Sequence, residues 1–145
     1  MTAEVRIGRT DHLRIRVLGR MHDATDYWDG NWLVTPIDAR FGGFTASVGA
    51  GLRAEEFRSF RDGLRQVNDT LTGAAVLESM EEWLELRLSA GSRGHLLVSG
   101  TLTDQVGRRP NSLRFSIGDL DQSDLPVILD ALDEVLAAFP VIGKP

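Results

Sequence analysis

Three histidines are the residues best suited to acid–base or metal chemistry in this chain of 145 residues, and they lie at positions 12, 22 and 95. His22, Asp23 and Asp26 are spaced closely enough to bind a metal ion together. A stable metal site, however, needs three or four ligands held in place by further hydrogen bonds. We therefore favour a solvated loop at this segment and predict no metal.

The sequence also lacks the motifs of common hydrolases and nucleotide-binding enzymes. It contains no Gly-x-Ser-x-Gly, no Gly-x-x-x-x-Gly-Lys-Ser and no His-Glu-x-x-His. Glu81, Glu82 and Glu85 surround Trp83 in a composition typical of glycosidases, but on a strand Glu82 would face away from Glu85. We predict that the protein is not an enzyme, with no catalytic residue and no cofactor.

Aromatic side chains gather between residues 26 and 33, where the sequence reads Asp-Tyr-Trp-Asp-Gly-Asn-Trp-Leu and holds the only Tyr and two of the three Trp. Asp29-Gly30-Asn31 predicts a turn, because Gly adopts positive φ readily and Asp and Asn bond nearby backbone. The segment from Trp32 to Ile37 predicts a strand that reaches a sheet edge or bulge at Pro36. We expect Trp32 to be a core residue and Trp28 to be more exposed.

Three interpretations of this aromatic corner remain open. Its rings are expected to close the end of a hydrophobic core, which is what large aromatics usually do. Alternatively, Trp28 stacks on a sugar or a base that Asp26, Asp29 or Asn31 orients. A third alternative is a protein-binding hot spot, since Trp and Tyr are enriched there. A calcium loop fits poorly, because Tyr27 occupies a position that needs an oxygen ligand.

The net charge of −5 argues against nucleic-acid binding, which requires a concentrated basic surface. The first 20 residues carry five Arg, whereas residues 119–145 carry six acidic residues against one Lys. Cysteine is absent, so no disulfide framework forms. We find neither a signal peptide nor an apolar run of bilayer length, and we expect a cytoplasmic protein that contacts no membrane.

Alternation of polar and apolar residues predicts about eight strands. Two stripes of apolar residues at spacings of three and four predict amphipathic helices, from Arg53 to Leu71 with a stop at Thr72-Gly73, and from Ser123 to Phe139. Ser123 or Asp124 is expected to cap the second helix, with Pro126 in its first turn. The expected strands span residues 4–8, 12–18, 32–37, 44–52, 74–78, 82–88, 95–103 and 113–117.

These elements predict an α+β fold in which antiparallel meanders pack one face against the two helices. We expect a single domain over residues 1–145, with halves 4–72 and 73–140 that each consist of strands followed by a helix. An ancient duplication and the frequent recurrence of meanders both explain that order. The expected core comprises Trp32, Phe57, Phe60, Leu64, Leu84, Leu86, Phe115, Leu129, Leu132 and Phe139.

The run from Asp26 to Leu33 resembles the signature of the WapI family of bacterial immunity proteins. Weaker similarities to the same family span most of the chain: Leu52-Arg53 with Glu56-Phe57, Gly94-His95, and Asp121-Gln122 with Leu125-Pro126. The resemblance implies a cytoplasmic protein that protects its cell by binding a cognate toxin domain, often a nuclease. It implies no particular set of toxin-contacting residues.

Charge suggests where such a partner binds, because a nuclease carries a basic cleft to which an inhibitor presents carboxylates. One candidate surface is acidic and lies on the last helix, and a second surrounds Trp83, which we expect to be exposed on a strand. The aromatic corner is the third, and a small-ligand or carbohydrate-binding module that uses it remains the alternative function. The candidate partner-binding residues are Trp28, Asp29, Glu82, Trp83, Glu85, Asp130, Asp133 and Glu134.

Overall fold

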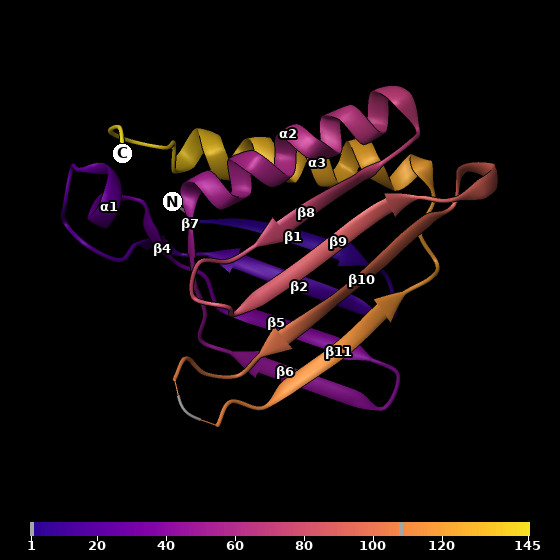
Figure 1. Cartoon of the computed structure of the whole chain (residues 1–145), viewed down its shortest axis with the longest axis horizontal. Helices are drawn as coiled ribbons and strands as arrows, with labels where there is room; N and C mark the ends of the chain where they lie inside the picture. Colours follow the sequence, from indigo (N-terminus) through magenta and orange to yellow (C-terminus); the bar gives the residue numbers. More distant parts are fainter. Residues whose placement is uncertain (1, 108) are drawn as a thin grey trace.

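A computed structural model describes residues 2–107 and 109–145. Within these residues, eleven strands form two four-stranded sheets and one three-stranded sheet, and all the strand pairs are antiparallel (Figure 1). The predicted α+β class is confirmed. No helix in the described part of the chain is both long and apolar enough to cross a membrane.

The first sheet has the strand order β1-β2-β5-β6. Its register places Val5, Ile15, Ile37 and Val48 in one row across the four strands, and all four side chains are buried. Alternate residues therefore form an apolar inner face, as the period of two predicts. The strands span Ala3–Gly8 (β1), His12–Val17 (β2), Ile37–Phe41 (β5) and Phe44–Val48 (β6).

The second sheet is an uninterrupted meander with the order β8-β9-β10-β11. Ala75, Leu88, Val98 and Ile117 lie in register across it and form a buried row. The predicted antiparallel pairing of residues 82–88 with 95–103 is confirmed, although the first of these strands begins two residues later. The strands span Ala74–Glu78 (β8), Leu84–Ala90 (β9), Leu96–Thr103 (β10) and Ser112–Ile117 (β11).

The third sheet is small and divides two of the predicted strands. It contains β3 (Gly19–Arg20), β4 (Trp32–Val34) and β7 (Gly51–Arg53). The expected strand over residues 32–37 breaks at Thr35, whose buried hydroxyl donates to the Ala50 carbonyl and accepts from the Leu52 amide. The Thr35 amide also donates to the Ala50 carbonyl, and the hydroxyl takes the Leu52 amide, where the small sheet ends and the chain passes into β5. The expected strand over residues 44–52 divides likewise into β6 and β7.

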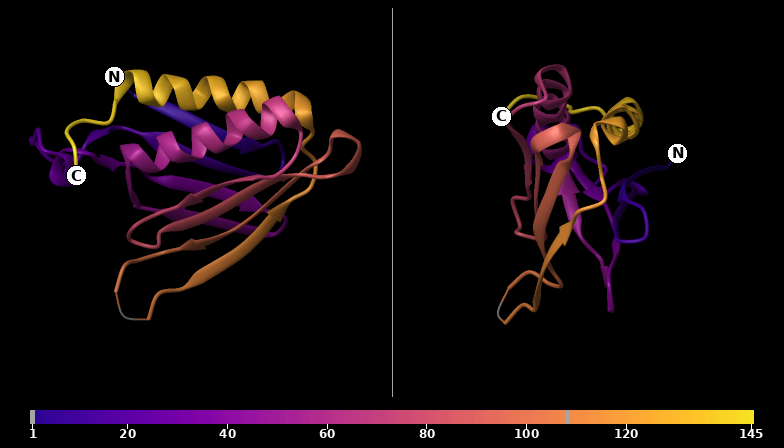
Figure 2. Two further views of the ribbon diagram at one scale, coloured as in Figure 1. Left: turned by 45° about the horizontal axis from the view of Figure 1, so that its top comes forward. Right: turned by 90° about the vertical axis from the view of Figure 1, so that its right-hand side faces the viewer.

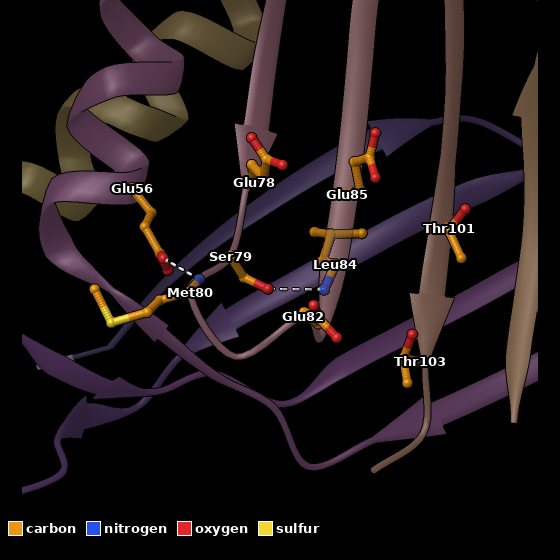
Figure 3. Close-up of a pocket in the computed structure, with 9 residues that line it drawn as sticks. All are labelled: Glu56, Glu78, Ser79, Met80, Glu82, Leu84, Glu85, Thr101 and Thr103. Carbon is orange, nitrogen blue, oxygen red and sulfur yellow. Dashed lines mark hydrogen bonds between the residues drawn. The ribbon is translucent and has the colours of Figure 1, made fainter. Parts of the chain in front are cut away.

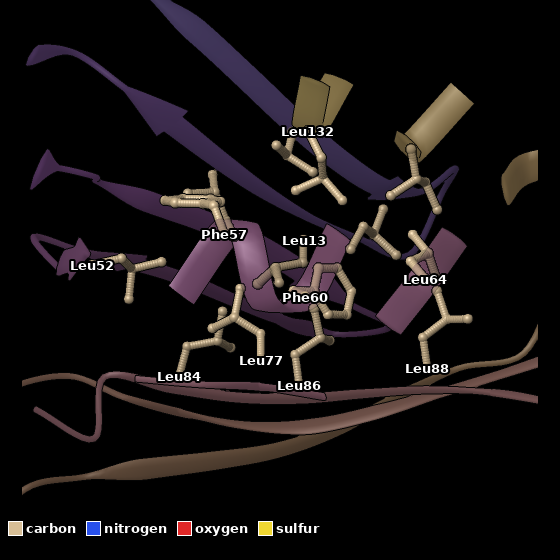
Figure 4. Packing of buried hydrophobic residues seen from close by; sticks show 14 of the residues in the cluster. Leu13, Leu52, Phe57, Phe60, Leu64, Leu77, Leu84, Leu86, Leu88 and Leu132 are labelled. Carbon is tan, nitrogen blue, oxygen red and sulfur yellow. The ribbon is translucent and has the colours of Figure 1, made fainter. Parts of the chain in front are cut away.

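Helices α2 (Ala54–Thr70) and α3 (Leu125–Ala138) lie side by side along one edge of the two large sheets (Figure 2). Helix α2 packs beside β8 and α3 packs beside β1, so each helix contacts the first strand of the other half's meander. The helices therefore cover the β1 and β8 edges, and the inner faces of the sheets face each other. Both halves contribute to one hydrophobic core (Figure 4).

Two predicted helix ends differ from those observed. Leu71 is exposed and adopts the left-handed conformation (φ 53°), so it ends α2 and does not extend the buried stripe. Neither Ser123 nor Asp124 caps α3 through its side chain. A 3₁₀ turn, η2 (Gln122–Asp124), precedes that helix, and its cap is Asp121, whose carboxylate accepts from the Ser123 amide at 2.8 Å.

Nine of the ten predicted core residues are buried. Trp32 is the exception, since it is only half-buried and lies outside the core cluster. Trp32 belongs to the aromatic corner formed by residues 26–33.

Candidate functional site

The aromatic corner begins with a single helical turn, α1 (Tyr27–Gly30). The carboxylate of Asp26 caps this turn by accepting from the Asp29 amide at 3.1 Å. The predicted turn at residues 29–31 is therefore wrong in detail, because Asp29 and Gly30 belong to α1 and Asn31 follows it. A capped helical turn provides hydrogen-bond partners for the local backbone groups, as a β-turn would.

The guanidinium of Arg53 organises this corner. Arg53 is only 1% exposed, and its two terminal nitrogens donate to the carbonyls of Trp28 (2.6 Å) and Tyr27 (2.8 Å). Its Nε forms an ion pair with Glu55, whose side chain is mostly buried. The guanidinium carbon also lies over three aromatic rings, at 4.7 Å from Trp32, 5.4 Å from Tyr27 and 5.8 Å from Trp28.

This arrangement corrects the prediction that Trp32 is a core residue. The ring of Trp32 stacks on a buried cation and not on core side chains, which leaves it half-buried. Trp28 is more exposed, at 54%, as predicted. Its ring meets the Tyr27 ring edge-on at 5.0 Å, and Asp29 beside it is exposed.

The carboxy-terminal segment closes the corner through Asn31, which is fully buried. The Asn31 amide donates to the carbonyls of Tyr27 and Ile142, both at 2.9 Å, and accepts from the Ile142 amide at 3.0 Å. Gly30 has no room for a side chain, because a Cβ there would lie 2.4 Å from Ile142. The Gly-Asn pair of the motif therefore positions the backbone and the chain end.

An open hollow of about 630 Å³ lies beside this corner, around the connection between β8 and β9. Four glutamates line it, one from the first turn of α2, one from the end of β8, one from the connection and one from β9. We call this site the acidic hollow (Figure 3). Its lining residues are Glu56, Glu78, Ser79, Met80, Glu82, Leu84, Glu85, Thr101 and Thr103.

Glu82 and Glu85 line the same hollow, contrary to the prediction that they face apart. That prediction placed Glu82 on a strand, whereas β9 begins at Leu84 and Glu82 has a φ of 62° in the preceding turn. The left-handed backbone breaks the alternation of side chains. Trp83 is also not the exposed aromatic that we expected, since it is half-buried and packs against the core.

Glu56 connects the acidic hollow to the aromatic corner. Its Oε1 accepts from the Arg53 amide at 2.8 Å, and its Oε2 accepts from the Met80 amide at 2.6 Å. Burial raises the pKa of Glu56 above its ordinary value, and the two backbone hydrogen bonds oppose that effect. The corner, the start of α2 and the β8–β9 connection consequently lie at one end of the molecule (Figure 1).

The acidic residues of α3 lie apart from the hollow. Asp133 forms ion pairs with Arg65 at 3.0 Å and Arg61 at 3.4 Å, both on α2. Its charge therefore helps to join the two helices. Asp130 and Glu134 are exposed, and Glu134 lines a different depression beside Glu4 and Arg16.

The three histidines are not gathered into one site. His12 begins β2, His22 is exposed in the connection after β3, and His95 is exposed and bridges to Asp121. Within residues 2–107 and 109–145, no group of three or more His, Cys, Asp or Glu side chains has an arrangement that could hold a metal ion.

Sequence reasoning missed three residues that matter at this end of the molecule: Arg53, Glu56 and Glu78. Arg53 is the last residue of β7 and precedes α2, a position that gives no sign of burial. A signal for Glu56 was present, because a Glu three residues after a helix cap often bonds the cap amide. Glu78 is the last residue of an alternating strand, and that pattern predicts only that its side chain faces outward.

Comparison with known proteins identifies one family. The model of the "Immunity protein WapI-like family" matches residues 5–140, which is nearly the whole chain. No curated protein and no solved structure matches.

Proposed function

Because the chain belongs to the immunity protein WapI-like family, we propose that it binds and neutralises a cognate toxin domain in the cytoplasm through the acidic hollow. We further propose that this toxin domain carries a basic, nucleic-acid-handling surface, as a nuclease does. The observation that carries the proposal is a set of carboxylates that lack cationic partners among the residues that the structure describes.

The carboxylates of Glu78, Glu82 and Glu85 are exposed. None of the three forms an ion pair with any residue that the structure describes. Glu78 and Glu85 also lie directly opposite each other in the β8–β9 ladder. Like charges at such positions destabilise a sheet. A partner that brings Arg or Lys side chains would relieve this repulsion, so the arrangement favours a basic partner.

The outward side chains of the same row change character across the sheet. Glu78 is opposite Glu85, Glu85 is opposite Thr101, and Thr101 is opposite Arg114. Within this row, the negative charges therefore lie on β8 and β9 and the positive charge lies on β11, while Arg87 is the cation nearest to Glu85 along β9. A basic cleft that approaches this end would meet carboxylates in its path, which raises the association rate and fixes the orientation of the complex.

The α3 carboxylates support this role less well. Asp133 already has two arginine partners, so a toxin would compete with the α2–α3 contact for its charge. Asp130 and Glu134 lie on the solvent side of α3 and provide a matched control, because their replacement changes the net charge by the same amount as changes in the hollow.

The test is rescue of cells that express a cognate toxin domain, for which a toxin gene found beside this one is the first candidate. We expect the wild-type chain to restore growth. The Glu82→Lys/Glu85→Lys variant should lower survival at least 100-fold, because loss of a central charged pair typically costs several kcal/mol of binding. The Asp130→Lys/Glu134→Lys variant, with the same charge change, should still rescue.

Two outcomes would count against the proposal in different ways. If the toxin kills cells equally with and without the wild-type chain, the immunity role toward that toxin is wrong. If the wild-type chain rescues and the hollow variant rescues as well, while thermal unfolding shows both variants folded, the acidic hollow is not the binding site.

A further inference from the structure

Trp28 lies at the same end of the molecule as the acidic hollow and is exposed although its backbone is held firmly. The residue is 54% exposed, whereas its carbonyl accepts from the buried guanidinium of Arg53 at 2.6 Å. An exposed large aromatic on a fixed backbone loses little conformational entropy when it is covered. Such side chains are typical anchors of protein interfaces.

Arg53 is the group that fixes this ring. It bonds two consecutive carbonyls of α1, lies 5.8 Å from the Trp28 ring and supports the Tyr27 ring that Trp28 meets edge-on. The turn itself is only four residues long, which is too short for helical hydrogen bonding to hold it. Asp26 caps the turn and Asn31 bonds the Tyr27 carbonyl. Arg53, immediately before α2, is the group that bonds the Trp28 carbonyl and also lies near its ring.

The same segment of α2 also holds the acidic hollow. The Arg53 amide donates to Glu56 Oε1, and the other oxygen of that carboxylate accepts from Met80 in the β8–β9 connection. Residues 53–56 thus join the aromatic corner on one side to the carboxylates on the other. A partner seated over Glu82 and Glu85 therefore has Trp28 within the same continuous end of the molecule.

We propose that Trp28 is the apolar anchor of the toxin interface and that Arg53 is a positioning residue, which presents this ring in a fixed orientation beside the acidic hollow. The proposal rests on the proposed function for its occupant, the basic face of the toxin domain. Basic side chains suit both parts of the surface, because a guanidinium or ammonium group pairs with the glutamates and also stacks on an indole.

The first test needs no toxin. In a Trp32→Phe/Trp83→Phe background, Trp28 is the single indole, and its fluorescence anisotropy decay reports how freely the ring moves. We expect a ring that moves with the whole protein, and a fast local component after Arg53→Lys, since an ammonium cannot bond both carbonyls and lie flat on the rings. Arg61→Lys, elsewhere on α2, is the control and should leave the decay unchanged.

The second test is a double-mutant cycle with a catalytically inactivated form of the toxin domain that the wild-type chain neutralises in the rescue experiment. We expect Trp28→Ala to weaken binding roughly 30-fold, as truncation of an interface hot spot does. Arg53→Lys should weaken it about tenfold, but less than twofold when Trp28 is already Ala, because coupled residues are not additive. Circular dichroism checks that each variant is folded at the assay temperature.

The outcomes separate this inference from the proposed function. A mobile indole in the parent protein, an indole that stays rigid after Arg53→Lys, or additive effects in the cycle would overturn the positioning role. Normal binding by Trp28→Ala would overturn the anchor. If the parent chain forms no complex with the toxin domain, the proposed function fails for that pair and the anchor fails with it, while the anisotropy result still decides what Arg53 does.

Discussion

The aromatic corner and the acidic hollow are neighbours, but they differ in whether their polar groups are paired within the chain. In the corner, the buried groups of Arg53 and Asn31 are bonded to carbonyls, amides or carboxylates of the same chain. In the hollow, the carboxylates of Glu78, Glu82 and Glu85 have no cationic partner among the described residues. In the corner, the buried guanidinium and amide are therefore bonded within the chain, although Oε2 of Glu55 has no hydrogen-bond partner among the described residues. The hollow, in contrast, retains unpaired charge.

This difference separates architecture from binding. The hydrogen bonds of Arg53 and Asn31 stabilise the fold, because each buried polar group that lost its partner would cost free energy. Unpaired like charges that face each other on a strand pair lower the stability of the sheet, and their repulsion favours a partner of opposite charge. Trp28 is the one part of the corner with a large exposed ring, which is why it belongs with the hollow in the proposed interface.

The largest effect should come from removing the centre of the corner. Arg53→Met should destabilise the protein by about 3 kcal/mol, because it leaves the buried Glu55 carboxylate and the Trp28 carbonyl without a donor. The Tyr27 carbonyl would keep only its bond from Asn31. Urea denaturation followed by circular dichroism measures this. A loss below about 1 kcal/mol would mean that water replaces the guanidinium and that the corner is less complete than its contacts indicate.

Truncation of the two corner tryptophans should lower stability by smaller amounts, which differ between the two residues. Trp32→Ala should cost about 2 kcal/mol, because the ring is half-buried and covers a buried cation. Trp28→Ala should cost less than about 1 kcal/mol, since its ring is mostly in solvent. Thermal unfolding of both variants decides the matter, and a larger loss for Trp28 would reverse the assignment of structural and binding roles.

A substitution in the acidic hollow should raise the stability of the protein and not lower it. Glu78→Thr removes the repulsion with Glu85 and should stabilise the protein by about 0.5 kcal/mol. Glu4→Thr is the matched control, because Glu4 also lies on an edge strand but is opposite Arg16 and forms an ion pair with Arg14 at 3.7 Å. That change should lose a few tenths of a kcal/mol. Equal responses of the two variants in urea denaturation would show that the charge opposite each residue is irrelevant.

The smallest effect concerns Glu56, which belongs to both regions. Burial raises the pKa of Glu56 in the folded state, so folding favours the protonated carboxyl. The resulting contribution to stability is fully present below the ordinary pKa of a glutamate. It is lost as the pH rises through the raised pKa of the folded state. The stability of the wild type relative to Glu56→Gln should therefore increase when the pH is lowered from 7 toward 4.5. Parallel pH profiles of the two proteins would contradict the raised pKa.

Much of the fold could be predicted because periodicity reports which side of an element is buried. The stripe of Phe57, Phe60 and Leu64 and the alternation of Leu84 and Leu86 identified core faces correctly. The sheet break at Thr35 could not be predicted, because it depends on hydrogen bonds to Ala50 and Leu52, which lie 15 and 17 positions away in the sequence. Periodicity carries no information about such contacts.

The candidate site was predictable only in part. Composition pointed to Glu82, Glu85 and the aromatic run, but not to their common end of the molecule, which depends on the left-handed turn at Glu82 and on the contacts of Arg53 and Glu56. A charged side chain such as Arg53 is usually exposed, so its burial follows only from the three rings and two carbonyls that surround it. Asp133 resembled a binding residue because its arginine partners lie on another helix.

The most direct test of the central claim is to map the toxin interface by NMR. Amide resonances of the ¹⁵N-labelled chain would be recorded with and without the inactivated toxin domain. We predict the largest shifts in residues 78–85, in Thr101 and Thr103, and around Trp28, with little change along the exposed side of α3. Shifts confined to Asp130, Glu134 and their neighbours, with the β8–β9 connection unchanged, would contradict the claim that the acidic hollow binds the toxin.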